Sequence, residues 1–174
     1  MRRSQQRQAA VVALYQHDLT GRQVGETLAP DASPFSRALA EAAAEMAQQL
    51  DAVIELHAHG WSVQRIQPLE RSIMRIALVE ILHPHIAPGL SPIPPEGAIE
   101  EAVRTAKTFC GSEAPAFVNG VLAAALREVR DNERCAQVRD GEASTAAGED
   151  RAAGEDRVAG EDRDLAELRA EQAR

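Results

Sequence analysis

The chain has 174 residues, of which 44% are hydrophobic and 3% aromatic, and its formal net charge is −8. The length fits one domain with a tail. The charge is uneven, because residues 1–130 hold 12 basic and 14 acidic side chains whereas residues 131–174 hold 7 and 13. A uniformly basic nucleic-acid binder is therefore excluded, although a local basic patch is not.

The composition favours an all-α fold. Alanine and leucine are frequent, and no run of alternating β-branched residues is present. The two cysteines, Cys110 and Cys135, and the five histidines lack metal-binding spacing, so we expect no metal site and no disulfide framework. The chain has no apolar run of about 18 residues and no signal-peptide pattern, which predicts a soluble, cytoplasmic protein without membrane contact.

Residues 4–19 form the first predicted helix, with Ser4 as the candidate N-cap. Arg2, Arg3 and Arg7 crowd its N-terminal end, where positive charge opposes the helix dipole. A compensating group is expected outside the helix, and RNA phosphate is one candidate. The residues alone also fit a solvated, frayed basic terminus. The face predicted to point inward carries Val11, Leu14, Tyr15 and Leu19.

The next segment is predicted to hold one long helix. Residues 20–30 read as a loop or one short helical turn, and Ser33 and Pro34 read as an N-cap with proline at the first helical position. Apolar residues then recur at three- and four-residue steps up to Gly60, which predicts a single amphipathic helix. A further helical turn is expected over residues 63–66.

Residues 68–82 are predicted to form a central helix that other helices surround, because only a narrow polar stripe interrupts its apolar surface. Glu80 falls inside the apolar face. A carboxylate in that position costs several kcal/mol unless it is paired or hydrogen-bonded. We interpret Glu80 as a structural ion pair or a helix-capping acceptor. A general acid or base is the alternative, and spacing places no second reactive group near it.

Residues 84–95 read as an extended, proline-rich connector before two closing helices. The first of these is predicted to stop at Gly111 and to carry an ion pair between Glu100 and Arg104 on its outer face. The second contains Gly120, which calls for a reason such as the close approach of another helix or of a ligand backbone, since glycine weakens a helix by about 1 kcal/mol relative to alanine.

After Arg130 the apolar periodicity ends and the segment AGEDR recurs three times. We therefore expect residues 131–174 to form a mostly disordered acidic tail. Such a tail would either compete weakly with RNA for the N-terminal arginines or serve only to keep the chain soluble.

Three blocks in this sequence resemble the NusB family of transcription antitermination factors. They are RRSQQRQAAVVALYQHDL, LERSIMRIALVEIL and the pair EEAVRTAKTF and FVNGVLAAAL, in the family's order across nearly all of residues 2–130. The resemblance implies a compact bundle of about six to seven helices in two helical subdomains. It also implies binding of a boxA-like single-stranded RNA from ribosomal RNA operons, together with the ribosomal protein NusE, in an antitermination complex with RNA polymerase.

Carried over residue by residue, the resemblance implies RNA contacts from the first helix and from the FVNG block, and one contact to NusE from the start of the central helix. The implied RNA-binding residues are Arg2, Arg3, Arg7, Tyr15, Phe117 and Asn119, and the implied NusE-binding residue is Glu70. Departures from the family pattern occur at Glu100, Ala116 and Val79, and the first helix is less arginine-rich than in many relatives. They imply that RNA binding is weaker here or more dependent on the partner.

No phosphate-binding glycine loop, dinucleotide fingerprint, nucleophile elbow or metal spacing is present, so we expect a binding module without cofactors rather than an enzyme. Two alternatives remain. One is a helical protein–protein scaffold or homodimer with weakened RNA binding, which the low basic content favours. The other, ranked last, is an RNA-modifying enzyme, because the NusB-like domain also occurs fused to RNA cytosine methyltransferases.

Overall fold

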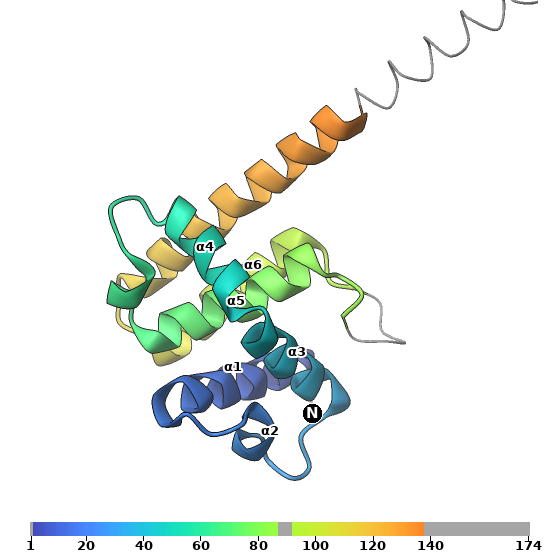
Figure 1. Cartoon of the computed structure of the whole chain (residues 1–174), viewed down its shortest axis with the longest axis vertical. Coiled ribbons are helices and arrows are strands. Elements are labelled where there is room, and N and C mark those ends of the chain that lie inside the picture. The colour runs from blue at the N-terminus through green and yellow to red at the C-terminus, as the bar shows by residue number, and fades with distance from the viewer. Residues whose placement is uncertain (1, 87–91, 138–174) are drawn as a thin grey trace, which may run out of the picture. The chain divides into compact units, whose positions relative to one another are not determined.

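The computed structural model describes residues 2–86 and 92–137. In these residues the regular secondary structure is entirely helical, and no strand is present. The elements, in chain order, are α1 (Arg3–Thr20), α2 (Val24–Thr27), α3 (Pro34–Glu45), α4 (Ala47–His57), the 3₁₀ helix η1 (Val63–Arg65), α5 (Pro68–Leu82), α6 (Pro95–Phe109) and a last helix over residues 114–137 (Figure 1). The predicted all-α fold is confirmed.

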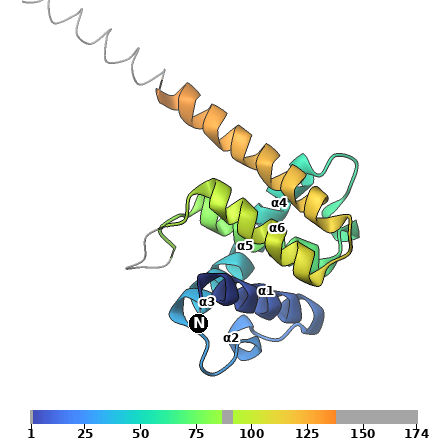
Figure 2. The ribbon, with the colours of Figure 1, turned by 180° about the vertical axis from the view of Figure 1, so that it is seen from behind.

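The chain divides into two units, Met1–Glu128 and Val129–Arg174. The first unit holds α1 to α6 and the start of the last helix. In both ribbon views α1, α2 and α3 form one group, and α4, α5 and α6 form a second, as two helical subdomains require (Figures 1 and 2). In the second unit residues 129–137 are helical. The AGEDR repeats lie outside the described residues, so their predicted disorder and their predicted competition with RNA stay predictions.

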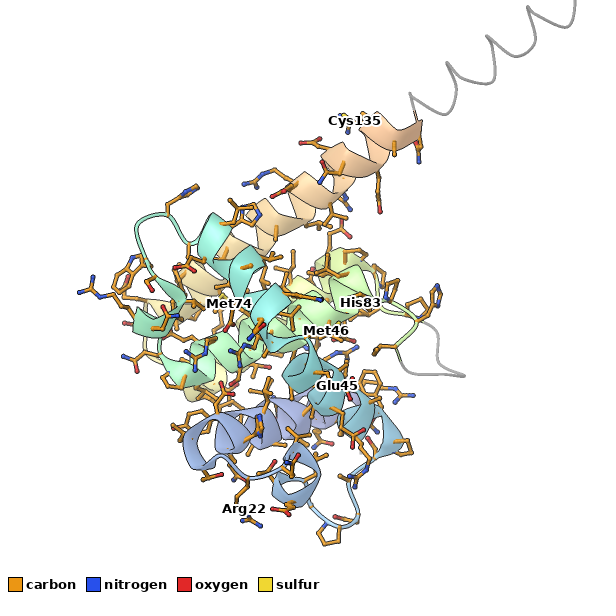
Figure 3. All side chains as sticks on the ribbon, viewed as in Figure 1. Arg22, Glu45, Met46, Met74, His83 and Cys135 are labelled. Atoms are coloured by element: carbon orange, nitrogen blue, oxygen red, sulfur yellow. The ribbon has the colours of Figure 1, made fainter. Side chains whose placement is uncertain are left out.

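Helix α5 organises the first unit, as the sequence predicts. It packs against α1, α3, α4 and α6, and every residue from Ser72 to Ile81 is buried. Met74, which Figure 3 labels, is fully buried at the centre of this helix. Burying a large apolar side chain stabilises the fold by about 1.5–3 kcal/mol, so the buried apolar residues of α5 contribute strongly to the shared core.

The predicted single helix up to Gly60 is wrong, because the chain breaks at Met46 between α3 and α4 (Figure 3). Met46 has φ −94° and ψ 14°, outside the regular helical geometry. Both α3 and α4 pack on α5, and the bend allows each of them to bury its own apolar face there. The N-cap prediction at the start of this segment is confirmed, since Ser33 Oγ accepts a hydrogen bond from the Ser36 backbone N–H at 3.1 Å.

Several local expectations also need correction. Helix α1 starts at Arg3, one residue before the predicted cap Ser4, because the side chain of Gln5 accepts a hydrogen bond from the Arg2 backbone N–H at 2.9 Å. Leu19 is 57% exposed rather than inward, since it lies in the last turn of α1. The end of α1 is set by Gly21, whose φ of 69° is the left-handed conformation that glycine adopts without strain.

Three local predictions for α6 and the last helix also differ from the structure. Arg104 pairs with Glu101 and not with Glu100. Helix α6 ends at Phe109 with an extended Cys110 instead of a left-handed Gly111. The last helix continues past the point where apolar periodicity stops, and a 3.7 Å ion pair between Arg134 and Asp131 lies on that extension.

Candidate nucleic-acid interface

The N-terminal end of α1 presents an unusual concentration of positive charge. Arg2 is the N-cap and Arg3 the first helical residue, both side chains are exposed, and the first turn contains no acid. The free N–H groups and the positive dipole end of a helix attract anions at this position. Arginine guanidinium groups placed there strengthen the attraction, so this end of the helix suits a phosphate group.

The side chain of Arg3 is held by two neighbours. Its Nη1 donates a hydrogen bond to Gln6 Oε1 at 2.7 Å, and its Cζ lies 4.7 Å from the centroid of the Phe35 ring. Within residues 2–86 and 92–137 no carboxylate oxygen lies within 4.0 Å of this guanidinium. The exposed guanidinium of Arg3 is therefore not paired with a carboxylate in this part of the chain.

Arg7 lies one turn further along α1, and its environment is different. Only 8% of the residue is exposed, and its Nε and Nη2 each donate a hydrogen bond to the Glu80 carboxylate at 2.8 Å. The interpretation of Glu80 as a structural ion pair is confirmed. The group that compensates Arg7 is thus a carboxylate of α5 and not a phosphate, which makes Arg7 a weak candidate for direct RNA contact.

A second ion-pair cluster joins the other end of α1 to α5 and α4. Asp18 Oδ2 accepts from Arg75 Nη1 at 2.9 Å and from Arg71 Nη2 at 3.2 Å, while Arg75 also donates to both oxygens of Asp51 at 2.6 and 2.7 Å. Burial lowers the pKa of Arg75, but the two aspartates more than offset this, so the net pKa is raised.

The sequence reasoning missed this cluster, although a signal was present. Arg75 stands between two buried apolar residues of α5, Met74 and Ile76, as Glu80 stands between Val79 and Ile81. At 100° per residue, however, Arg75 falls beside Arg71 on the polar stripe of α5, so its burial is marked less clearly than that of Glu80. Tyr15, the remaining predicted RNA contact on α1, is half-buried and lies about 18 Å along the helix axis from Arg3.

Two of the remaining predicted contacts line a pocket of about 280 Å³. Glu70, in the first turn of α5, and Phe117, in the first turns of the last helix, both line it, together with Glu113 and the 55% exposed Trp61. Burial raises the pKa of the Glu70 carboxyl above its ordinary value. The structure therefore brings the predicted NusE contact and one predicted RNA contact to the same pocket.

Asn119 lies elsewhere on the same helix. It is exposed and lines a wider hollow of about 530 Å³ with Lys107, Cys110 and Ala116. Burial raises the pKa of the Cys110 thiol, and the charge of Glu70 raises it further. The two hollows are thus close enough for their ionisable groups to interact, and neither Arg2 nor Arg3 is among the residues that line them.

Metal-binding clusters and membrane-spanning helices are absent from the described residues. No three His, Cys, Asp or Glu side chains in it gather in a way that could hold a metal ion. No helix in residues 2–86 and 92–137 is long and apolar enough to cross a membrane.

Gly120 is also explained only in part. A Cβ atom built on it meets no other atom within 4 Å, so the close approach of another helix is not the reason for this glycine.

The fold and these surfaces define an all-helical binding module. Residues 4–127 match the NusB family, and the chain belongs to this family, whose members are transcription antitermination factors and not enzymes. It is 34% identical over 148 residues to the transcription antitermination protein NusB of Rubrobacter xylanophilus, which covers 82% of this chain and 99% of that protein.

Solved structures show the same fold. The structure of T. maritima NusB superposes with a TM-score of 0.62 at 26% identity, covering 74% of this chain and 92% of that one. The antitermination factors NusB and NusE have been crystallised together with double-stranded RNA, and a chain of that complex has a TM-score of 0.61 at 26% identity over 74% of this chain and 99% of that one.

Proposed function

We propose that this chain is a cytoplasmic RNA-binding transcription antitermination factor. It acts on ribosomal RNA operons by binding boxA-like single-stranded RNA together with NusE, as part of an antitermination complex with RNA polymerase. The observation that carries the proposal is the pair of exposed arginines, Arg2 and Arg3, at the N-terminus of α1. Membership of the NusB family and the similarity to the NusB–NusE–RNA complex support it.

Two parts of the surface carry opposite charge, which supports two separate partners. Arg2 and Arg3 have no carboxylate counter-ion among residues 2–86 and 92–137, and such unpaired positive charge suits RNA phosphate. The pocket of Glu70 and Glu113 carries two carboxylates beside aromatic rings, which disfavours phosphate and suits a cationic or apolar side chain of a protein. We therefore assign the arginines to RNA and Glu70 to NusE.

The FVNG block completes the proposed RNA surface. Asn119 shares its hollow with Lys107, so an RNA strand would find both an amide and a cation there. Phe117 lines the neighbouring pocket, where its half-buried ring is available for stacking against an unpaired base or against a side chain of the partner. Tyr15 and Arg7 are proposed at most as supporting residues, because one is distant along α1 and the other is paired with Glu80.

The test is a titration of labelled boxA-like single-stranded RNA with the full chain, at two salt concentrations, with and without NusE. We expect weak binding by the chain alone, a clear salt dependence, and tightening by NusE. A double-stranded RNA of equal length is the control for strand preference. Binding that shows neither a partner effect nor a salt dependence would contradict the proposal. If light scattering then showed a stable dimer that ignores RNA, the scaffold interpretation would replace it.

The assignment of Glu70 has its own variant. Glu70→Gln should abolish most of the tightening by NusE while the affinity of the chain alone for RNA stays unchanged. A loss of RNA affinity in the absence of NusE would place Glu70 on the RNA surface instead.

A further inference from the structure

The ring of Phe35 lies beside two guanidinium groups of α1. The Cζ atom of Arg3 is 4.7 Å from the ring centroid, and that of Arg7 is 5.3 Å from it. Phe35 itself is only 8% exposed and belongs to the first turn of α3. Two cations that are four residues apart on one helix therefore share a single aromatic ring from another helix.

The two cations differ in their net charge at this site. Arg7 is neutralised by its two hydrogen bonds to Glu80, whereas Arg3 has no carboxylate within 4.0 Å among the described residues. A cation over an aromatic face is attracted to it even where water has access. The ring thus stabilises one uncompensated charge, and that charge is at the surface.

The position of the ring relative to α1 is fixed. Ser33 caps α3 through the backbone N–H of Ser36, and Ser36 Oγ donates a hydrogen bond to the Gln6 carbonyl oxygen at 2.9 Å. Gln6 in turn accepts the hydrogen bond from Arg3 Nη1. Ring, helix cap and arginine therefore form one connected set of contacts between α1 and α3.

We propose that Phe35 is a positioning residue for RNA binding, which holds the guanidinium group of Arg3 in a fixed plane at the N-terminus of α1. The inference rests on the proposed function. A guanidinium group has five N–H donors, and those not given to Gln6 remain available to phosphate oxygens. A side chain that is already ordered loses less conformational freedom when the RNA binds, so the ring increases affinity without touching the RNA.

The experiment measures the affinity of labelled boxA-like single-stranded RNA at low salt for the full chain and its variants. Phe35→Leu keeps an apolar side chain but removes the aromatic face, and we expect about two- to fivefold weaker binding. Phe35→Tyr keeps the face and should bind like the unchanged chain. Leu39→Val, one turn further along α3, is the control for a general loosening of the core and should leave RNA affinity unchanged.

The arginine is tested in the same series. Arg3→Ala should weaken binding roughly tenfold, as expected for the loss of a charge-assisted phosphate contact. In the Arg3→Ala background, Phe35→Leu should have no further effect, because the ring acts only through that side chain. Thermal unfolding of each variant, followed by circular dichroism, establishes that the fold is retained.

The outcomes separate the inference from the proposed function. If Arg3→Ala weakens binding but Phe35→Leu does not, or if the two effects are additive, the positioning role is wrong and the RNA surface stands. Equal weakening by Leu39→Val and Phe35→Leu would also overturn the positioning role. If Arg3→Ala leaves RNA affinity unchanged, the assignment of α1 to RNA fails, and the inference fails with it.

Discussion

Arg7 on α1 forms a bidentate ion pair with Glu80 on α5, through two hydrogen bonds that are each 2.8 Å long. The two residues are 73 positions apart in the sequence. Both side chains are almost completely buried, at 10% and 7% exposure. At the other end of α1, Asp18 bonds to Arg71 and Arg75 of α5. The two helices are therefore joined by charged groups at both ends, and the N-terminal arginines extend from a helix that is firmly held.

Glu80→Gln should destabilise the fold strongly. It leaves the buried Arg7 guanidinium without a counter-charge, and breaking one side of a buried pair costs about 3–5 kcal/mol. Urea unfolding would measure the loss. The double variant Arg7→Met with Glu80→Leu removes both charges and should recover most of the stability. A Glu80→Gln chain within about 0.5 kcal/mol of the unchanged chain would contradict the importance of the pair.

Glu70→Gln should gain stability relative to the unchanged chain as the pH rises. The ordinary pKa of a glutamate side chain is 4.5, and burial raises that of Glu70 in the folded state. The folded chain therefore binds this proton more tightly than the unfolded chain. As the pH rises past the raised pKa of Glu70, the carboxyl group loses its proton and the unchanged chain loses stability. Glutamine has no such dependence. The test compares the unfolding free energies of both chains at about pH 4 and about pH 7, below and above the titration of this carboxyl group. An equal difference between the two chains at both pH values would contradict the prediction.

Cys110 should react faster with iodoacetamide in the Glu70→Gln variant. Burial is the larger cause of its raised pKa and the charge of Glu70 is the second, so removing that charge moves the pKa back toward its ordinary value. More thiolate is then present at a given pH, and the thiolate is the reactive form. The rate is measured in a Cys135→Ser background, which leaves Cys110 as the single thiol. Equal rates with and without Glu70 would mean that the two groups do not interact.

Gly120→Ala should stabilise the chain by about 0.5–1 kcal/mol. Gly120 lies inside a helix, it does not have a positive φ, and an added Cβ meets open space. RNA affinity should fall in the same variant if a ligand backbone approaches there. Gly21→Ala is the matched control and should destabilise the chain, because its φ of 69° strains alanine. Loss of stability in Gly120→Ala would contradict the open environment of this residue.

Much of the fold could be predicted because local signals mark its boundaries. The predicted bounds of α5 agree with the structure residue for residue, since Pro68 occupies the first helical position and Pro84 follows the helix end. The cap at Ser33 was equally visible. The break at Met46 was not, because the surrounding residues are good helix formers and the bend is required only by packing on α5.

The site was predictable only in outline. The apolar pattern of α5 shows that Glu80 is buried, but nothing local shows that its partner lies 73 residues away. Arg7 therefore reads as an equal of Arg2 and Arg3 in the sequence, whereas the structure separates them by burial. The stacking of Arg3 on Phe35 was likewise hidden, because it joins two helices whose relative position depends on the whole core.

Arg2 and Arg3 are proposed as the main phosphate-binding groups, and the salt dependence of RNA affinity tests this role most directly. Each single-stranded phosphate contact contributes about 0.7 to the slope of log affinity against log salt concentration. The Arg2→Ala, Arg3→Ala double variant should therefore make this negative slope shallower, by about 1.4 in magnitude. Arg22→Ala, which removes an exposed arginine that pairs with Glu26, should leave it unchanged. A slope that stays the same in the double variant would contradict the assignment of this helix end to RNA.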